Sequence, residues 1–234
     1  MSAAGGAGIF AGVIKSALLD LLYPRECAAC GARIPEPERL AVCAGCDGRL
    51  EWIPPPGCLR CGAAEARGAC GECAGREFLF AGATALGKYE GRLRDFVLAL
   101  KFRGSRYLAD EFGRRLAGRI ARRFDLVVPV PMSRWKLLFR GYNAAALVGE
   151  RMAGHAGLPF SARALRKVRR TKPQAELERE ERLLNPKGAY WSKPVRGVVL
   201  LVDDVLTTGA TANACTEALR AAGATEVHVA VVAR

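Results

Sequence analysis

The sequence has no hydrophobic run that is long and uncharged enough to cross a membrane. An apolar N-terminal stretch, residues 9–22, contains Lys15 and Asp20 and falls short of the roughly 20 apolar residues that a bilayer requires. No basic segment precedes this stretch, as one would in a secretory signal. We therefore interpret it as an amphipathic helix docked on the protein's own body, with contact at a membrane surface as the alternative. We expect no stable membrane insertion and a cytoplasmic location.

Histidines and aromatic residues are scarce. The two histidines, His155 and His228, have no pattern of partner residues around them, so we assign them no role. Aromatic residues make up 7% of the chain. Trp135, Phe139 and Tyr142 form the one tight aromatic group beside a basic stretch, and this limits the surfaces on which bases of single-stranded DNA could stack.

Acidic residues are too few to balance the basic ones. The 23 Asp and Glu residues face 36 Lys and Arg residues, which gives a formal charge of +13. The excess is concentrated in residues 88–140, with 14 basic and 5 acidic residues, and in residues 163–196, with 11 and 4. Such a field attracts phosphates, whether on a small ligand or on nucleic acid. An Arg-rich surface that serves only solubility is the alternative interpretation.

Cysteine, in contrast, is abundant in the N-terminal third. Eight of the nine cysteines form pairs separated by two residues, and all eight fall within 47 residues. Two such thiolates reach one ion from a tight turn, and a second pair completes a tetrahedral site of four sulfurs. The sequence therefore predicts two structural zinc ions rather than disulfides, because cytoplasmic thiols stay reduced. The four pairs are Cys27/Cys30, Cys43/Cys46, Cys58/Cys61 and Cys70/Cys73.

The pairing between these motifs is open at this point. Joining the first pair with the second and the third with the fourth closes the shortest loops and costs least entropy. A crossed arrangement is the alternative. Residues 43–52 also suggest a short helix after the second pair. The ninth cysteine, Cys215, lies in an apolar helical pattern and is predicted to be a core residue.

The rest of the chain alternates strand and helix patterns, which is typical of an α/β domain with a central parallel sheet. Residues 198–202 are wholly apolar, as in a strand buried on both faces. We place the domain boundary near Glu77, between a zinc-binding module at 1–77 and an α/β domain at 78–234. The other elements that we expect are helices over 93–100, 108–120, 142–153 and 209–222, and strands over 125–130 and 227–232.

The end of the buried strand carries the most informative motif. Asp203 and Asp204 follow the apolar run, and a loop of small residues, 207–211, then opens a helix. Ligands of open α/β sheets bind at the carboxyl ends of strands, and the N-terminus of a helix suits a phosphate. A phosphate held by the loop and a ribose diol held by the acidic pair fit this motif. Ordinary capping of a helix by threonine is the alternative.

The 198–211 stretch resembles the signature of type I phosphoribosyltransferases, which binds phosphoribosyl pyrophosphate (PRPP). The resemblance implies that Asp203 and Asp204 contact the ribose hydroxyls and that the loop wraps the 5′-phosphate. It also implies that Mg²⁺ accompanies the ligand. The loop residues concerned are Thr207, Thr208, Gly209, Ala210 and Thr211.

Further segments are similar to the ComF family of competence proteins, whose members join paired-cysteine zinc units to such a domain. The resemblance runs from Leu18 to the C-terminus and implies a role in DNA uptake or DNA processing, with single-stranded DNA and proteins of the competence machinery as partners. Ala144 departs from the family, which usually has Gln at this position. The segments that carry the resemblance are 101–104, 128–131, 140–143 and 170–174, together with Arg182 and Asn185.

Transfer of the phosphoribosyl group would need basic side chains and Mg²⁺ to neutralise charge on the departing pyrophosphate. Arg134, Lys136 and Arg140 follow the strand at 128–131, and Lys172 and Arg170 lie in a polar stretch that could act as a mobile lid. Two functions remain open. The chain is either a binding protein that acts in DNA uptake, or an active phosphoribosyltransferase with an acceptor that the sequence does not identify.

Overall fold

The computed structural model describes residues 26–34, 41–64, 70–169 and 188–234. The chain forms two compact units, Met1–Arg49 and Leu50–Arg234. The expected helix at residues 9–22 lies outside the described residues. Among the residues that are described, no helix is long and apolar enough to cross a membrane. The boundary near Glu77 stays a prediction about which part of the chain folds independently.

The first unit is small and is organised around the first two cysteine pairs. A bridge between Glu26 and Arg33 closes a turn in which Gly31 adopts a positive φ of 71°. Helix α2, Ala44–Asp47, begins directly after Cys43, as the sequence suggested.

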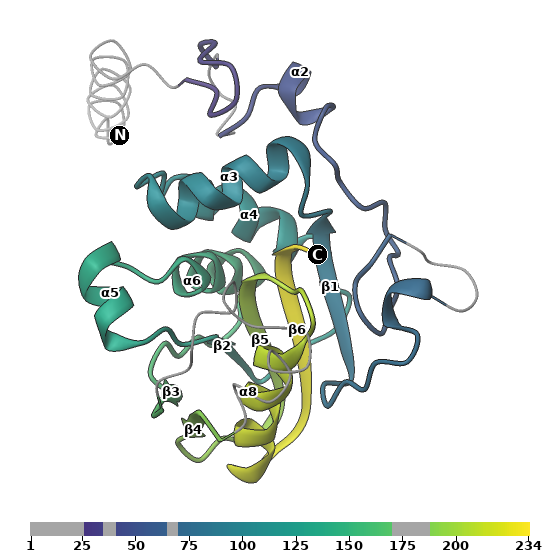
Figure 1. Ribbon diagram of the computed structural model, residues 1–234, viewed down its shortest axis with the longest axis vertical. Helices are drawn as coiled ribbons and strands as arrows, with labels where there is room; N and C mark the ends of the chain where they lie inside the picture. Colours follow the sequence, from purple (N-terminus) through teal and green to yellow (C-terminus); the bar gives the residue numbers. More distant parts are fainter. Residues whose placement is uncertain (1–25, 35–40, 65–69, 170–187) are drawn as a thin grey trace, which may run out of the picture. The chain divides into compact units, whose positions relative to one another are not determined.

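The second unit contains a four-stranded parallel sheet with the strand order β1-β6-β5-β2 (Figure 1). The register aligns Val202 of β5 with Pro129 of β2 on one side and with Ala230 of β6 on the other. The carboxyl ends of the strands therefore meet at one edge of the sheet. The strands are β1 (Gly82–Gly87), β2 (Leu126–Pro129), β5 (Gly197–Val205) and β6 (Ala224–Ala233).

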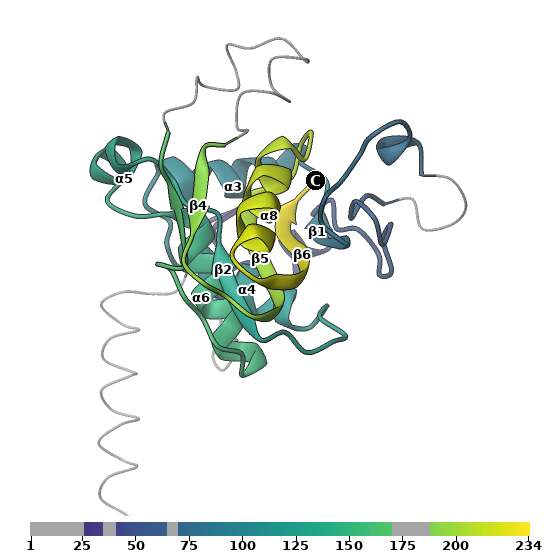
Figure 2. The same cartoon turned by 90° about the horizontal axis from the view of Figure 1, so that it is seen from below.

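Helices cover both faces of this sheet (Figure 2). Helices α3 (Gly91–Phe102), α4 (Leu108–Ala117) and α6 (Ala144–Ala156) pack on one face. Helix α8 (Ala210–Ala221) packs on the other, beside the antiparallel pair β3 (Leu165–Lys167) and β4 (Tyr190–Ser192). This arrangement explains the apolar run in β5, where Val199 to Val202 are all at most 2% exposed.

The structure confirms the α/β fold and, within the residues that it describes, the expected helices and strands, with ends that shift by a few residues. It adds elements that the sequence analysis did not predict, namely β1, the pair β3 and β4, the short helix α5 (Arg134–Arg140) and the single helical turn at Gly71–Cys73. These elements are short, and hydrophobic periodicity is weak over so few residues.

Residues 51–59 cover the outer edge of the sheet. The Ile53 amide donates to the Leu86 carbonyl at 2.9 Å, and the Ala83 amide donates to the Leu59 carbonyl at 3.1 Å. These bonds satisfy backbone groups of β1 that an open edge would leave unpaired. The segment that carries the third cysteine pair is therefore built onto the sheet itself.

Candidate functional site

The eight paired cysteines form two clusters of four, and within each cluster all sulfur atoms lie within 4.8 Å of one another. The Sγ atoms are 3.8 Å apart for Cys30 and Cys43 and 3.7 Å apart for Cys61 and Cys70. A tetrahedral zinc ion with Zn–S bonds of about 2.3 Å requires edges of about 3.8 Å. The residues therefore fit zinc, and the sequential pairing is confirmed. The clusters are Cys27, Cys30, Cys43 and Cys46, and Cys58, Cys61, Cys70 and Cys73.

Backbone amides stabilise a thiolate in the first cluster. Burial raises the pKa of Cys27, but hydrogen bonds from the backbone of Cys43 and Ala29 outweigh this and lower the pKa to about 6. The pKa of Cys58 in the second cluster is lowered to about 7, because backbone donors again overcome the effect of burial. The thiolate is the form that binds metal. Four sulfur ligands leave no open position for water or substrate, so both sites are structural.

The acidic pair lies at the carboxyl end of β5, and its two side chains point to opposite faces of the sheet, as neighbours in a strand do. Asp204 forms an ion pair with Lys101 at the end of α3, with 2.7 Å between Oδ1 and Nζ. The Asp204 amide donates to Asp203 Oδ1 at 2.8 Å. Lys101 thus brings a cation from a distant helix to the acidic motif.

Asp203 has an unusual protonation equilibrium. Burial and the neighbouring Asp204 carboxylate raise the pKa of Asp203 to about 8, and the Lys101 ammonium reduces this rise. The Asp203 carboxyl group therefore retains its proton to a higher pH than an ordinary aspartate does. Such a group can donate a hydrogen bond, or can release its proton when a ligand favours the charged form.

The turn after β5 has the backbone conformation that we expected from its small residues. Gly209 caps α8 in the left-handed region with a φ of 84°, and a Cβ atom at this position would lie 2.6 Å from Cε1 of Phe78. Glycine is required there on both grounds. Thr208 Oγ1 accepts a hydrogen bond from the Ala210 amide at 3.3 Å, which orders the first turn of the helix.

These groups line one pocket of about 250 Å³. Asp203, Asp204, Lys101 and Tyr89 line it together with the turn and the first residues of α8. The structure therefore brings together every residue that the sequence analysis assigned to PRPP: Asp203, Asp204, Thr207, Thr208, Gly209, Ala210 and Thr211.

A second pocket of about 370 Å³ shares Tyr89, Lys101 and Asp204 with the first. Three further cations, Lys136, Arg140 and Lys167, line it. Burial lowers the pKa of Lys167, and the nearby Lys136 ammonium lowers it further. A cluster of cations in a concave site attracts a group with several negative charges, such as a pyrophosphate.

The four predicted catalytic cations are distributed unevenly. Lys136 and Arg140 line the second pocket, and the Arg140 guanidinium lies 4.2 Å from the centre of the Phe102 ring. Arg134 is exposed at the first residue of α5 and lines neither of these two pockets. Lys172 lies outside the described residues, together with Arg170, Arg182 and Asn185. Ala144 begins α6 and is buried.

Sequence reasoning missed Tyr89, Lys101 and Lys167. Lys101 stands in one of the segments that resemble the ComF family, but only the tertiary structure places it against Asp204. Each of the two histidines contacts a carboxylate outside the two pockets: His155 lies beside Asp110 and His228 beside Glu226.

Comparison with known proteins agrees with this geometry. A double zinc ribbon domain matches residues 18–75, and a phosphoribosyl transferase domain matches residues 148–234. Together with the parallel sheet and the pocket at its edge, these matches define the chain as a phosphoribosyltransferase-fold protein with a double zinc ribbon. A solved structure of the allosteric regulatory enzyme of purine biosynthesis is 25% identical and covers 53% of this chain and 25% of that one, at a TM-score of 0.33, which is too low to carry an argument.

The chain belongs to the ComF family. Competence protein F of Haemophilus influenzae is 30% identical over 209 residues, which cover 82% of this chain and 90% of that protein. Competence protein ComFC of Streptococcus pneumoniae is 28% identical, with coverage of 80% and 84%. The DNA utilization protein YhgH of Salmonella typhimurium is 30% identical, with coverage of 74% and 81%.

Proposed function

We propose that this chain binds PRPP together with Mg²⁺ at the carboxyl end of β5 and acts in DNA uptake or DNA processing. The observation that carries the proposal is one pocket that is lined both by the acidic pair and by the turn that opens α8. The relatives named for competence and DNA utilization support the biological role.

Each part of the ligand has a matching group in the chain. The carboxyl groups of Asp203 and Asp204 bind the ribose hydroxyls. The turn at 207–211 and the positive end of α8 bind the 5′-phosphate. Lys101, Lys136 and Arg140 face the pyrophosphate. Mg²⁺ would offset pyrophosphate charge and would be held largely by ligand oxygens and water, as this ion prefers.

Binding is tested by calorimetry with PRPP and Mg²⁺. Asp→Asn at both 203 and 204 keeps the shape of the site and removes its charge. Charge-assisted hydrogen bonds contribute roughly 1.5–3 kcal/mol each, so the double variant should bind about tenfold to a few hundredfold more weakly. Asp95→Asn, at an exposed position of α3, is the control and should bind as the wild type does. Equal affinity for PRPP in the wild type and the double variant would mean that PRPP does not bind in this pocket.

Turnover is the second candidate function. The cations of the second pocket favour it, because a departing pyrophosphate would be neutralised beside the ribose site. In this case the chain is a phosphoribosyltransferase whose acceptor has to be identified. Pyrophosphate release from PRPP in the presence of candidate bases measures the activity. Lys136→Ala and Arg140→Ala should reduce it more than Arg134→Ala, since Arg134 lines neither pocket.

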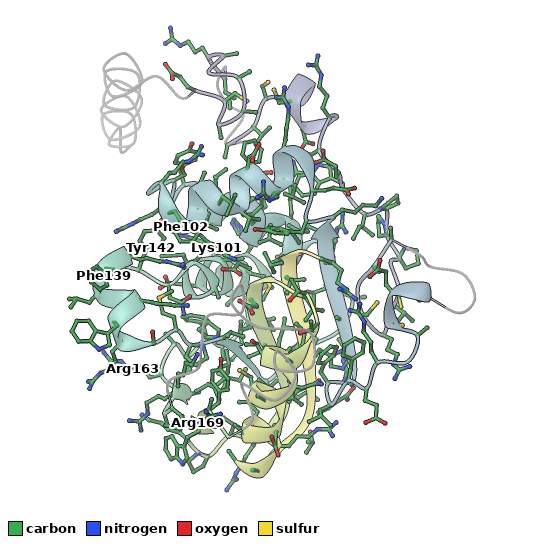
Figure 3. All side chains as sticks on the ribbon, viewed as in Figure 1. Lys101, Phe102, Phe139, Tyr142, Arg163 and Arg169 are labelled. Atoms are coloured by element: carbon green, nitrogen blue, oxygen red, sulfur yellow. The ribbon has the colours of Figure 1, made fainter. Side chains whose placement is uncertain are left out.

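Single-stranded DNA as a partner is supported by the surface of α5. Trp135 is 55% exposed and Phe139 is 84% exposed, with their rings 6.3 Å apart and inclined by 28°. In Figure 3, Phe139 projects outward from α5, and Phe102 lies nearby at the C-terminal end of α3. Exposed aromatic rings among cations suit unpaired bases and their phosphates. Tyr142 does not belong to this surface, because it is buried.

A further inference from the structure

The second zinc cluster adjoins the phosphate-binding turn through the segment that follows Cys73. Arg76 Nη1 donates a hydrogen bond to the Thr207 carbonyl at 3.2 Å. Asn213 of α8 binds the same segment twice. Its Nδ2 donates to the Glu77 carbonyl at 2.9 Å, and its Oδ1 accepts from the Leu79 amide at 2.9 Å. The turn and the start of α8 are therefore joined to residues 76–79.

Arg234 makes a more direct link between the cluster and the turn. Its Nε donates to the carbonyl of Cys61, a cysteine of the cluster, at 2.9 Å. Its Nη1 donates to the carbonyls of Thr207 at 2.8 Å and Leu206 at 3.3 Å. The side chain is only 7% exposed. A buried guanidinium depends on its acceptors, so displacement of either the cysteine loop or the turn would leave it poorly paired.

Phe78 forms the apolar part of the same connection. It packs against the buried group formed by Cys61, Ala63, Cys70 and Cys73. It also lies against Gly209, where it occupies the space that a Cβ atom would need. Phe80 stacks on Phe78 with the ring centres 4.8 Å apart. One ring therefore touches both the cysteine cluster and the residue that caps α8.

The two guanidinium groups set the direction of the peptide between Thr207 and Thr208. Both donate to the Thr207 carbonyl, so this oxygen faces the zinc cluster. In a trans peptide the following N–H points the opposite way. The Thr208 amide is thus presented on the side of the turn away from Arg76 and Arg234. An orientation of this kind is what an amide needs to bind a phosphate.

We propose that the zinc ion of the second cluster, held by Cys58, Cys61, Cys70 and Cys73, acts as a structural part of the phosphate-binding turn. The positioning residues are Arg76, Phe78 and Arg234. They connect the cysteine segment, which the zinc ion orders, to residues 206–209. The consequence for ligand binding rests on the proposed function. Loss of this zinc alone weakens the ligand site, whereas loss of the first zinc, in the unit Met1–Arg49, leaves it intact.

The experiment compares four variants of the full chain, each analysed for zinc content. Cys58→Ser removes the second zinc and Cys27→Ser the first. Arg234→Ala breaks the link while both zinc ions remain, and Arg220→Ala, at an exposed residue of α8, is its control. Hydrogen exchange of residues 206–212 and the affinity for PRPP with Mg²⁺ are measured for each.

We expect faster exchange at 206–212 and at least about tenfold weaker binding for Cys58→Ser and Arg234→Ala. Arg234→Ala removes charge-assisted bonds to the turn, and Cys58→Ser removes the metal that holds the loop to which Arg234 is bound. Cys27→Ser and Arg220→Ala should match the wild type in both measurements. If Cys58→Ser also unfolds the surrounding segment, Arg234→Ala with two zinc ions decides. Unchanged exchange in Arg234→Ala, or equal effects of Cys27→Ser and Cys58→Ser, would overturn the proposal. A wild type that does not bind PRPP would refute the proposed ligand, and the exchange data would still decide the structural link.

Discussion

At the scale of the residue, the acidic pair shows how two adjacent identical side chains acquire different chemistry. Asp204 is paired with Lys101, whereas Asp203 is half-buried and forms no ion pair of its own with a residue that the structure describes, and its pKa is raised to about 8. The difference follows from the alternation of the strand, which turns one carboxyl group toward α3 and the other toward the opposite face. Carboxyl groups with a strongly raised pKa are found most often at functional sites.

The stability of the chain should therefore depend on the protonation of Asp203. Its pKa is near 3.8 when unfolded and about 8 when folded, so between these values the native state binds the extra proton. The contribution of this group to stability is therefore most favourable at low pH and is lost as the pH rises toward 8. Asp203→Asn removes this loss and keeps the acceptor for the Asp204 amide. Its melting temperature should exceed that of the wild type at pH 8, and the difference should shrink toward pH 5.

Thermal unfolding at several pH values measures this effect, with Asp95→Asn as the control for removal of an exposed carboxylate. A variant that melts at the wild-type temperature throughout would mean that Asp203 titrates as an ordinary aspartate. Since Asp→Asn at this position should weaken PRPP binding at the same time, the variant also tests whether stability and ligand binding compete there.

At the scale of the element, α5 is a helix that buries none of its residues. Local capping compensates in part, because Ser133 accepts from the Lys136 amide at 3.4 Å and Gly141 ends the helix with a φ of 72°. An N-cap of this kind contributes about 1 kcal/mol. A capped helix that keeps Trp135 and Phe139 in solvent is better explained by a binding role than by packing.

Truncation of both rings tests that role. Trp135→Ala combined with Phe139→Ala should weaken binding of a single-stranded oligonucleotide by about tenfold or more, since stacking contributes roughly 1–3 kcal/mol per base. PRPP affinity should not change. Leu138→Ala is the matched control, because Leu138 is 74% exposed on the same helix but is not aromatic. Fluorescence anisotropy at several salt concentrations measures the affinity, which should fall steeply with salt. An equal loss in Leu138→Ala would indicate nonspecific apolar contact.

At the scale of the whole molecule, the two cysteine clusters belong to different compact units. The first cluster lies in the unit that ends at Arg49. Among the described residues of this unit, Ile34 and Val42 are the buried apolar side chains besides the cysteines, so we expect the unit to depend on metal to fold. The second is attached to the sheet through residues 51–59 and 76–79. Two cysteine clusters of the same chemistry therefore have different structural surroundings.

The purified chain should contain two zinc ions, as measured by elemental analysis under reducing conditions. Cys27→Ser should retain one zinc ion and lose the order of the first unit. The sheet of Leu50–Arg234 should keep its secondary structure and its melting transition, because the first cluster contributes no ligand to it. A preparation without zinc, or loss of the whole α/β fold in this variant, would contradict the prediction.

Much of this protein follows from local sequence patterns. Spacings of two residues between cysteines predict the metal sites, because a tight turn brings such thiolates to one ion whatever the rest of the fold. The run 198–211 predicts a buried strand, an acidic end and a phosphate turn, because strand, turn and helix start within 14 consecutive residues. Patterns of this kind depend on backbone geometry over a few residues, and the chain alone determines them.

The remaining features depend on contacts between distant residues. Lys101 meets Asp204 across 103 positions of the chain and Arg234 meets Cys61 across 173, and neither pair has a local signal. The parallel order β1-β6-β5-β2 decides which strand ends become neighbours. The raised pKa of Asp203 arises in the same way, since burial by surrounding elements is its largest cause. Long-range packing sets the dielectric environment and the pairing of charges. Only the tertiary structure therefore decided which cations line the two pockets and which cysteine cluster adjoins the turn after β5.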